Sequence, residues 1–324
     1  MQQMQLPSFK LLHWQNVHFG DEMPPTHGIS AKIIGERDRE IGKTLRAGRE
    51  MKQEFKDYWR KEPKNALVTG ASSGMGLCYA EKLAEKGYNV LLISIDEKAM
   101  ADVAEGLQKR YPNQRIEYLV KDLAEDNAAE ELYEYTVQNG FNVNLLINNA
   151  GIFTFKDVLD MSLKKIETFI GLHVSTVTKL CRLFGEQMSK DGGGRIINMS
   201  SISAHTPYCG IALYTATKSY LLVFTKAFAL EMKERNVKVI AVCPGEVATG
   251  LYKLPVGLQK FGIFLGIIIP PQRLVKRVLK ANRRGKITII PGFGNRMFKP
   301  IFSILPTWFK LLIRRRIKRL ENNF

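Results

Sequence analysis

The chain has 324 residues and a formal net charge of +17, and 45% of its residues are hydrophobic, which is enough to build one large core. The four cysteines, Cys78, Cys181, Cys209 and Cys243, lie far apart without a C-x-x-C pair, so neither a metal site nor a disulfide framework is predicted, and a reducing, cytoplasmic location is expected. No apolar run reaches the about eighteen residues of a membrane span, and the N-terminus lacks the features of a signal peptide.

The positive charge is concentrated near the C-terminus. Residues 1–62 hold eleven basic and nine acidic side chains, residues 63–269 hold twenty-two and twenty-one, and residues 270–324 hold fifteen and one. A basic segment on a nearly neutral body predicts a local role for this charge. We therefore expect no nucleic-acid partner, because the segment matches no recognised nucleic-acid-binding fold.

The first part of the chain predicts a helical extension. Residues 35–61 are dense in charged side chains at helical spacing, which indicates an exposed helix within an N-terminal extension of residues 1–62. At the other end, a basic amphipathic extension of residues 293–324 is expected.

Between the extensions, short β-rich runs alternate with amphipathic helical runs, as in a parallel sheet covered on both faces. The expected strands are residues 65–70, 89–95, 115–121, 144–150, 194–201, 237–244 and 286–291. The expected helical runs include residues 76–87, 97–111, 128–139 and 216–235. This order predicts an α/β, doubly wound, Rossmann-type domain over residues 63–292 with seven parallel strands, whose ligands lie beyond the carboxyl ends of the strands.

A glycine-rich loop follows the first expected strand. The stretch LVTGASSGMG, residues 67–76, opens a helix, so its backbone N–H groups and the helix N-terminus would attract a phosphate. Gly70, Gly74 and Gly76 would permit the turn, the approach of a pyrophosphate and close packing of helix on strand. Taken alone, such a loop is equally typical of a simple turn.

Four further motifs follow in order. NNAG ends the fourth strand at residues 148–151, two serines end the fifth at residues 200–201, YTATK occupies residues 214–218, and CPGEVAT occupies residues 243–249. Together with the glycine loop they resemble the short-chain dehydrogenase/reductase family over roughly residues 64–250, and especially the branch of long-chain 3-oxoacyl reductases and 17β-hydroxysteroid dehydrogenases. The resemblance implies an NAD(P)(H)-dependent oxidoreductase that interconverts a ketone and a secondary alcohol.

The resemblance also implies the residues that bind the cofactor. They are Thr69, Gly70, Ser72, Ser73, Gly74, Met75, Gly76, Asp96, Asp122, Leu123, Asn149, Ala150, Gly151, Tyr214, Lys218, Pro244, Gly245, Val247 and Thr249. Ile95 stands where members that prefer NADP(H) carry an arginine, and Asp96 beside it would repel a 2′-phosphate, so the sequence favours NAD(H). The alternatives are that Asp96 begins the next helix and that Asp122 is a helix N-cap.

The chemistry predicts an acid–base group and a hydrogen-bond donor. Hydride transfer to a carbonyl places negative charge on oxygen, so a proton must be supplied. Tyr214, whose phenol has an ordinary pKa near ~10, would supply it once Lys218, one helical turn later, lowers that pKa. By the resemblance, Lys218 also binds the nicotinamide ribose and Ser201 holds the substrate oxygen. By themselves, a Tyr and a Lys four residues apart are usually a surface pair.

His173 departs from the family pattern, because many members carry an asparagine in this slot of the long helix, where it holds a water in a proton relay. An imidazole can donate from one nitrogen and accept at the other, so His173 would replace the amide and add a titration near neutral pH. The alternatives are a histidine satisfied by a backbone carbonyl and an impaired relay. The latter would suit a catalytically reduced member acting as a membrane-associated or protein-binding module, although intact Ser201, Tyr214 and Lys218 argue against it.

The segment after the last motif predicts the substrate class. Residues 251–271 are nearly free of charge and rich in Leu, Ile and Phe, and in the family this segment closes over the active site. A lid of that kind favours a lipophilic substrate such as a long acyl chain or a steroid. The alternative is that it packs against the N-terminal extension or a second subunit. The family's pairing of its long helices also implies a homo-oligomer, a dimer or a tetramer.

Residues 307–320 predict a membrane-surface helix. An apolar stripe of Phe309, Ile313, Ile317 and Leu320, with Trp308 and Leu312 beside it, faces away from a basic group that comprises Arg314, Arg315, Arg316, Lys318 and Arg319. This pattern is typical of helices that lie in the interface of an anionic membrane, so a peripheral membrane location is expected for the enzyme. The alternative is that Trp308, Phe309 and Ile313 pack onto the body of the enzyme or a second subunit.

Overall fold

The computed structural model describes residues 64–245, 247 and 268–297, together with residues 46, 50, 306–308, 311, 312, 314 and 315. The chain divides into two units, residues 1–52 and 53–324, and the fold below is that of the second. Of the helix expected over residues 35–61, only Arg46 and Glu50 are described; both are helical and exposed, and their charged groups lie 3.6 Å apart. The predicted boundaries at residues 62 and 292 stay a prediction.

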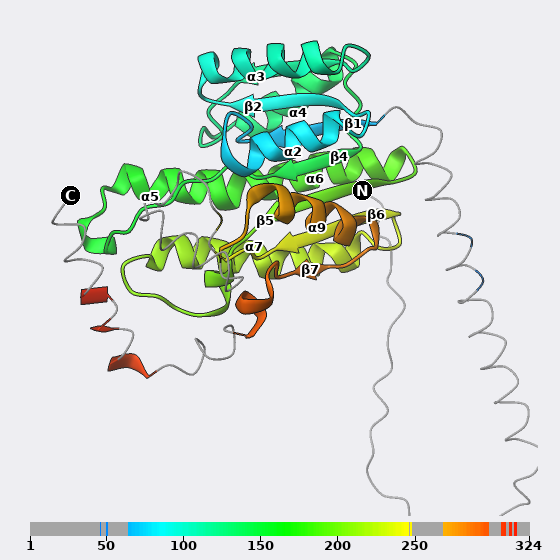
Figure 1. Ribbon diagram of the computed structural model, residues 1–324. Helices are drawn as coiled ribbons and strands as arrows, with labels where there is room; N and C mark the ends of the chain where they lie inside the picture. The colour runs from blue at the N-terminus through cyan, green and yellow to red at the C-terminus, as the bar shows by residue number, and fades with distance from the viewer. Residues whose placement is uncertain are drawn as a thin grey trace, which may run out of the picture. The chain divides into compact units, whose positions relative to one another are not determined.

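Seven parallel strands form one sheet in the order β3-β2-β1-β4-β5-β6-β7 (Figure 1). They are β1 Asn65–Thr69, β2 Asn89–Ser94, β3 Ile116–Val120, β4 Leu145–Asn148, β5 Gly194–Met199, β6 Val237–Val242 and β7 Thr288–Ile289. The sheet confirms the predicted doubly wound fold, and each observed strand lies within an expected one. Because the chain runs outward from β1 to β3 and then returns to β4 on the other side of β1, the strand order reverses between β1 and β4, which is where such folds bind ligands.

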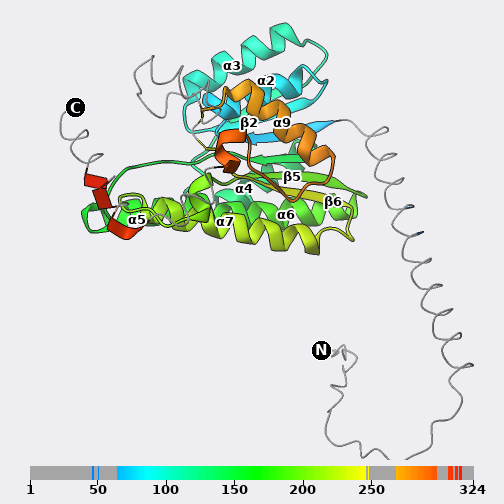
Figure 2. The same cartoon turned by 60° about the horizontal axis from the view of Figure 1, so that its bottom comes forward.

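Helices cover both faces of the sheet (Figure 2). The helices α2 Gly74–Ala84, α3 Glu97–Arg110 and α9 Pro271–Arg283 share one buried cluster, and α4 Ala128–Gln138, α6 Thr176–Lys190 and α7 Ala212–Glu231 share the other. Successive side chains of a strand point to opposite faces of the sheet, so one strand contributes to both clusters. In β1, for example, Val68 belongs to the first cluster and Leu67 to the second. This double burial explains the nearly continuous apolar composition of the central strands.

The helices differ from the sequence-based expectation in two ways. The last predicted helix, residues 216–235, begins four residues earlier and ends four residues earlier, as α7. In addition, α9 was not among the expected runs, although its sequence contains a signal for it. Pro271 stands in the first turn, where its missing N–H costs nothing, and Leu274, Val275 and Val278 recur at helical spacing and are buried.

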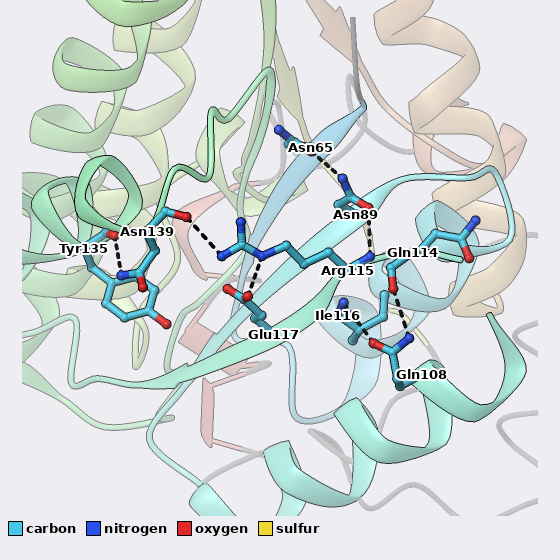
Figure 3. Close-up of polar contacts among 9 residues, drawn as sticks. All are labelled: Asn65, Asn89, Gln108, Gln114, Arg115, Ile116, Glu117, Tyr135 and Asn139. Carbon is cyan, nitrogen blue, oxygen red and sulfur yellow. Dashed lines mark hydrogen bonds and ion pairs between the residues drawn. The ribbon is translucent and has the colours of Figure 1, made fainter. Parts of the chain in front are cut away.

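Polar side chains fix the register of β1, β2 and β3 at their amino ends (Figure 3). Asn89 donates from its amide to Asn65 Oδ1 at 2.8 Å, and its Oδ1 accepts from the backbone N–H of Arg115, also at 2.8 Å. Gln108, near the end of α3, accepts from the backbone N–H of Ile116 at 3.2 Å. Because the strands are parallel, this cluster lies at the edge of the sheet opposite to the carboxyl ends, and it stabilises that edge without occupying the candidate site.

Candidate active site

The glycine loop between β1 and α2 packs backbone against backbone. Gly70 and Gly74 have φ values of 64° and 56°, which favour glycine. A Cβ atom on Gly76 would lie 1.9 Å from the carbonyl oxygen of Gly70, and one on Gly70 would lie 2.9 Å from the Cα of Ala150. Within the described residues, the N-cap residue Ser73 makes no side-chain capping hydrogen bond, so the first N–H groups of α2 are available to an anion. This cradle fits the pyrophosphate of a dinucleotide.

The NNAG segment ties the carboxyl end of β4 to that of β1. Thr69 Oγ1 accepts from the backbone N–H groups of Asn149 and Ala150, each at 2.9 Å, and Asn149 Nδ2 donates to the carbonyl of Thr69 at 2.9 Å. Asn149 Oδ1 is buried and has no hydrogen-bond partner among the described residues. A buried acceptor in the crevice fits a ligand that carries donors, and it adds to the fit of a nucleotide beside the glycine loop.

Ser201 and Tyr214 are brought together at the carboxyl edge of β5. Ser201 is the N-cap of the short helix η3, Ile202–His205, and its Oγ accepts from the N–H of Ser203 at 3.2 Å and from the Ser203 hydroxyl at 2.9 Å. Burial raises the pKa of Tyr214, while a hydrogen bond with Ser201 lowers it in part. This contribution places the Ser201 hydroxyl close to the phenol of Tyr214.

Lys218 lies one turn after Tyr214 on α7, and its side chain is buried. Its Nζ donates to the carbonyl of Met199 at 3.0 Å and lies 5.7 Å from the centroid of the Tyr214 ring, while Ser200 holds its backbone carbonyl at 2.7 Å. Burial lowers the pKa of Lys218 to about 8. Burial leaves the pKa of Tyr214 raised, and Lys218 is not among the groups that lower it in this arrangement.

His173 lies on η2, a π-helical turn over Gly171–Ser175 between α5, Leu163–Ile170, and α6. Its ring is fully buried, and its centroid is 6.0 Å from that of Tyr214. Nε2 accepts from the N–H of Ile152 at 3.0 Å, and Nδ1 is 3.1 Å from Thr217 Oγ1. Burial, together with the charge of Lys218, holds the pKa of His173 well below its ordinary value. This environment counts against the expected titration of His173 near neutral pH.

The two aspartates assigned to the cofactor satisfy backbone groups. Asp96 is the N-cap of α3 and accepts from the N–H of Ala99 at 3.0 Å, as the alternative interpretation predicted. Asp122 accepts from the N–H of Ala124 at 2.9 Å in the turn after β3, and Asn127, not Asp122, is the N-cap of α4. Ile95 is 70% exposed at the end of β2.

The remaining predicted residues are only partly described. Ser72 Oγ lies 3.0 Å from Ser94 Oγ, the carbonyl of Pro244 accepts from the N–H of Ile202 at 2.8 Å, and Val247 pairs with Ile269. Leu123 is buried, and the backbone of Gly245 packs closely on the side chain of Asn295. Thr249 lies outside the described residues, as do residues 251–267 of the expected lid.

The sequence did not identify Phe153 and Thr217 as site residues. The ring of Phe153 packs edge-on against Tyr214 with centroids 5.0 Å apart, and Thr217 contacts His173. Phe153 follows NNAG by two residues, and Thr217 lies inside YTATK. Their position in or beside these motifs is the feature of the sequence that could have identified them as site residues.

The C-terminal segment contacts the loop that follows NNAG. Arg314 forms an ion pair with Asp157, with 3.2 Å between Nε and Oδ1 and a second contact from Nη2 to Oδ2. Trp308 and Leu312 are 67% and 53% exposed. The stripe of Phe309, Ile313, Ile317 and Leu320 lies outside the described residues. Among the helices that are described, none is long and apolar enough to cross a bilayer, and the same residues contain no group of three or more potential metal ligands.

Comparison with known proteins identifies relatives of this chain. The profile of the short chain dehydrogenase family matches residues 64–254. An uncharacterized oxidoreductase of Thermotoga maritima is 30% identical over 59% of this chain and 74% of its own length, and the very-long-chain 3-oxoacyl-CoA reductase of Bos taurus is 33% identical over 58% and 61%. The structure of L-sorbose reductase from Gluconobacter frateurii, complexed with NADPH and L-sorbose, is 25% identical over 71% of this chain and 95% of that chain, with a TM-score of 0.63.

Proposed function

Because this chain belongs to the short-chain dehydrogenase/reductase family, NAD(P)-dependent oxidoreductases that act on CH–OH groups, we propose that it interconverts a lipophilic ketone and the corresponding secondary alcohol. The observation that carries the proposal is the meeting of Ser201, Tyr214 and Lys218 beside the glycine cradle. It favours catalysis over the alternative of a catalytically reduced binding module, since both the Ser201 hydroxyl and the Lys218 ammonium lie near Tyr214.

Each group has a defined task in the reaction. Bound nicotinamide supplies or accepts the hydride. Ser201 Oγ already accepts from the N–H and the hydroxyl of Ser203, so its own proton is directed to another oxygen and can hold that of the substrate. Tyr214 gives or takes the proton at that oxygen. The buried cation of Lys218 lies close enough to stabilise the negative charge that develops there.

Aromatic side chains near Tyr214 support a lipophilic substrate. Phe153 packs on the ring of Tyr214, and Phe155 covers Gly210, where a Cβ atom would meet the Phe155 ring at 2.5 Å. Residues 251–271 add an apolar composition, and Ile268 and Ile269 at their end are buried. We propose long-chain 3-oxoacyl compounds or steroid-like ketones as the substrate class, in line with the bovine relative.

A panel of ketones tests the proposal. We expect NAD(P)H-dependent reduction of long-chain 3-oxoacyl thioesters or steroid ketones, with kcat/KM at least about 10-fold above that for short or polyhydroxylated ketones, because apolar burial contributes ~0.8 kcal/mol per methylene. The Tyr214→Phe protein is the matched control for background reduction. A preference for sugar-like ketones would contradict the substrate class, and nucleotide binding without turnover on any ketone would support the binding-module alternative.

We further propose a preference for NAD(H). It is supported by the absence of a basic side chain from the described loop residues Ala71, Ser72 and Ser73 and from Ser94 and Ile95 at the end of β2. The role of Asp96 as a helix cap and the NADPH bound by the sorbose reductase count against it. Ile95→Arg places a guanidinium where a 2′-phosphate would be met. We expect the ratio of kcat/KM for NADPH over NADH to rise by about 10-fold or more, and an unchanged ratio would place the selectivity elsewhere.

The partners that we propose are a second copy of the chain and an anionic membrane surface. On α7, Tyr220, Val223 and Leu230 are exposed, and Tyr220 stacks on the partly buried Phe224, which suits a homo-oligomeric interface. Light scattering after size-exclusion chromatography would show a dimer or tetramer, whereas a monomer at micromolar concentration would contradict it. The membrane contact is supported by the composition of residues 307–320 and by the exposure of Trp308 and Leu312.

A further inference from the structure

We propose that His173 and Thr217 form a positioning pair for Tyr214, in which His173 stays neutral with its proton on Nδ1 and does not transfer protons. This inference adds a positioning role to the proposed function, and it rests on that function because it assumes that Tyr214 transfers the proton. It replaces the relay that the position of His173 in the sequence predicted, and it assigns a role to Thr217.

The hydrogen bonds determine which nitrogen carries the proton. A backbone N–H can only donate, so Nε2 of His173, which receives the N–H of Ile152 at 3.0 Å, must be unprotonated. The hydroxyl of Thr217 has one proton and donates it to the carbonyl of Tyr214 at 2.9 Å. Thr217 Oγ1 can then only accept from His173, so the proton lies on Nδ1, 3.1 Å away. Both nitrogens are occupied, and neither is left for a water or a substrate.

The charge next to the imidazole favours the same form. A Cβ atom on Gly151 would lie 3.0 Å from Nε2 of His173 and 3.5 Å from Nζ of Lys218, so both nitrogens lie close to this glycine. A protonated Nε2 would meet both the N–H of Ile152 and the ammonium of Lys218. Tyr214 and Lys218 of α7 are the titratable groups that face the ring, while Phe169 of α5 packs edge-on against it at 5.3 Å and carries no charge.

The pair connects three parts of the site. His173 comes from the π-helical turn, Ile152 from the loop after NNAG, and Thr217 from α7, where its hydroxyl reaches back to the residue that carries the reacting phenol. These hydrogen bonds therefore set the position of Tyr214 relative to Gly151 and to the loop that borders the crevice. A positioning residue of this kind acts on the alignment of the reacting atoms, to which rates are sensitive.

The tautomer can be measured directly in the wild-type protein. Long-range ¹H–¹⁵N correlation spectra of the ¹⁵N-histidine-labelled protein contain five imidazoles, and substitution of each histidine in turn identifies His173. We expect a neutral ring protonated on Nδ1 with chemical shifts that do not change from pH 6 to pH 8. A ring protonated on Nε2, or a titration in this range, would overturn the proposal. Neither outcome depends on turnover, so the pair can fail while the proposed function stands.

Two substitutions at Thr217 test the consequence for catalysis. Thr217→Val keeps the shape and removes the hydroxyl, and Thr217→Ser keeps the hydroxyl and removes the methyl group. We expect kcat to fall about 10-fold in the valine variant with the nucleotide Kd and the substrate KM within about twofold of wild type, and to recover in the serine variant. The ring of His173 should stay protonated on Nδ1 in the valine variant, because the N–H of Ile152 still donates to Nε2, but its Nδ1–H signal should shift because the acceptor Thr217 Oγ1 is lost. Wild-type kcat together with an unshifted Nδ1–H signal in Thr217→Val would refute the pair.

Folding is controlled separately. If Thr217→Val does not fold, the serine variant still has to retain the wild-type kcat and tautomer, and a loss in that variant would contradict a role for the hydroxyl. If Tyr214→Phe retains normal turnover, the proposed function fails, while the tautomer of His173 in the wild-type spectrum remains a separate result.

Discussion

Tyr214 carries the proton in the proposed reaction, and its substitution is the simplest test at the residue scale. Tyr214→Phe keeps the ring that packs on Phe153 and removes the transferable proton. We expect turnover to fall by about 10² or more while nucleotide binding, measured by fluorescence titration, persists. Turnover near the wild-type value would show that another group supplies the proton.

Lys218 gives the enzyme a pH-dependent stability with a defined sign. Its pKa is about 8 in the folded protein and near ~10.4 in the unfolded chain, so between these values the unfolded chain binds more protons than the folded one. The contribution of Lys218 to the free energy of unfolding therefore rises as the pH increases from about 8 to about 10. Below about pH 8, Lys218 is charged in both the folded and the unfolded state, so the burial of its charge lowers the free energy of unfolding by its full amount.

Urea denaturation of wild type and Lys218→Met measures this contribution. The difference between their free energies of unfolding should shift in favour of the wild type by on the order of 3 kcal/mol over this pH range. Subtracting the methionine variant removes the titration of all other groups. A difference that is independent of pH would mean that the folded-state pKa of Lys218 is close to its ordinary value.

Gly76 and Gly106 form a matched pair for the glycine cradle. A Cβ atom on Gly76 would lie 1.9 Å from the carbonyl oxygen of Gly70, whereas one on Gly106, inside α3, meets nothing within 4 Å. We expect Gly76→Ala to destabilise the protein by roughly 1–3 kcal/mol and to weaken nucleotide binding, and Gly106→Ala to stabilise it by about 0.5–1 kcal/mol. Chemical denaturation and nucleotide titration measure both, and unimpaired binding in Gly76→Ala would remove the cradle from the cofactor site.

At the scale of elements, the central strands were predictable because their side chains are buried on both faces. In NVLLIS, residues 89–94, the four central side chains are apolar and buried, and a short apolar run of this kind is typical of a buried parallel strand. The helix α9 was also encoded, by Pro271 and the spacing of its apolar residues, but it was missed because it follows the last motif. Strand positions thus followed from local composition, and helix ends did so less closely because tertiary packing decides them.

The site was predictable where a residue acts through its own place in a motif. The motifs and the family resemblance predicted that Ser201, Tyr214 and Lys218 act together, and the structure brings them close to one another, while their catalytic roles stay a prediction. His173 was placed correctly near Tyr214, but its partners depend on a π-helical turn, in which spacing along the sequence no longer gives the direction of a side chain. Asp96 was ambiguous because a carboxylate at the end of β2 can serve either a ribose or the first turn of a helix, and in this chain it serves the helix.

At the scale of the whole molecule, we propose that the C-terminal segment holds the enzyme at an anionic membrane surface. Binding to liposomes should require anionic lipid, weaken with salt and vanish on truncation after Pro306, because about 1 kcal/mol per basic group is an electrostatic, screened contribution. Co-sedimentation measures it. Asp157→Asn is the internal control, since it releases Arg314 without removing a basic group and should leave binding intact. Equal recovery with neutral and anionic vesicles, or binding that survives the truncation, would show that the segment is structural.

The strand order also dictates when the catalytic machinery can assemble during synthesis. The backbone N–H of Asn149 reaches the hydroxyl of Thr69 across 80 residues of sequence, and β1 cannot complete its pairing before β4 has emerged from the ribosome. At about 5–20 residues per second, this delay is roughly 4–16 seconds, during which one edge of β1 is uncovered. Lys218 arrives later still, so the nucleotide cannot guide the early steps of folding. Chaperones that shield apolar strand edges should therefore raise the yield of this enzyme more than added cofactor does.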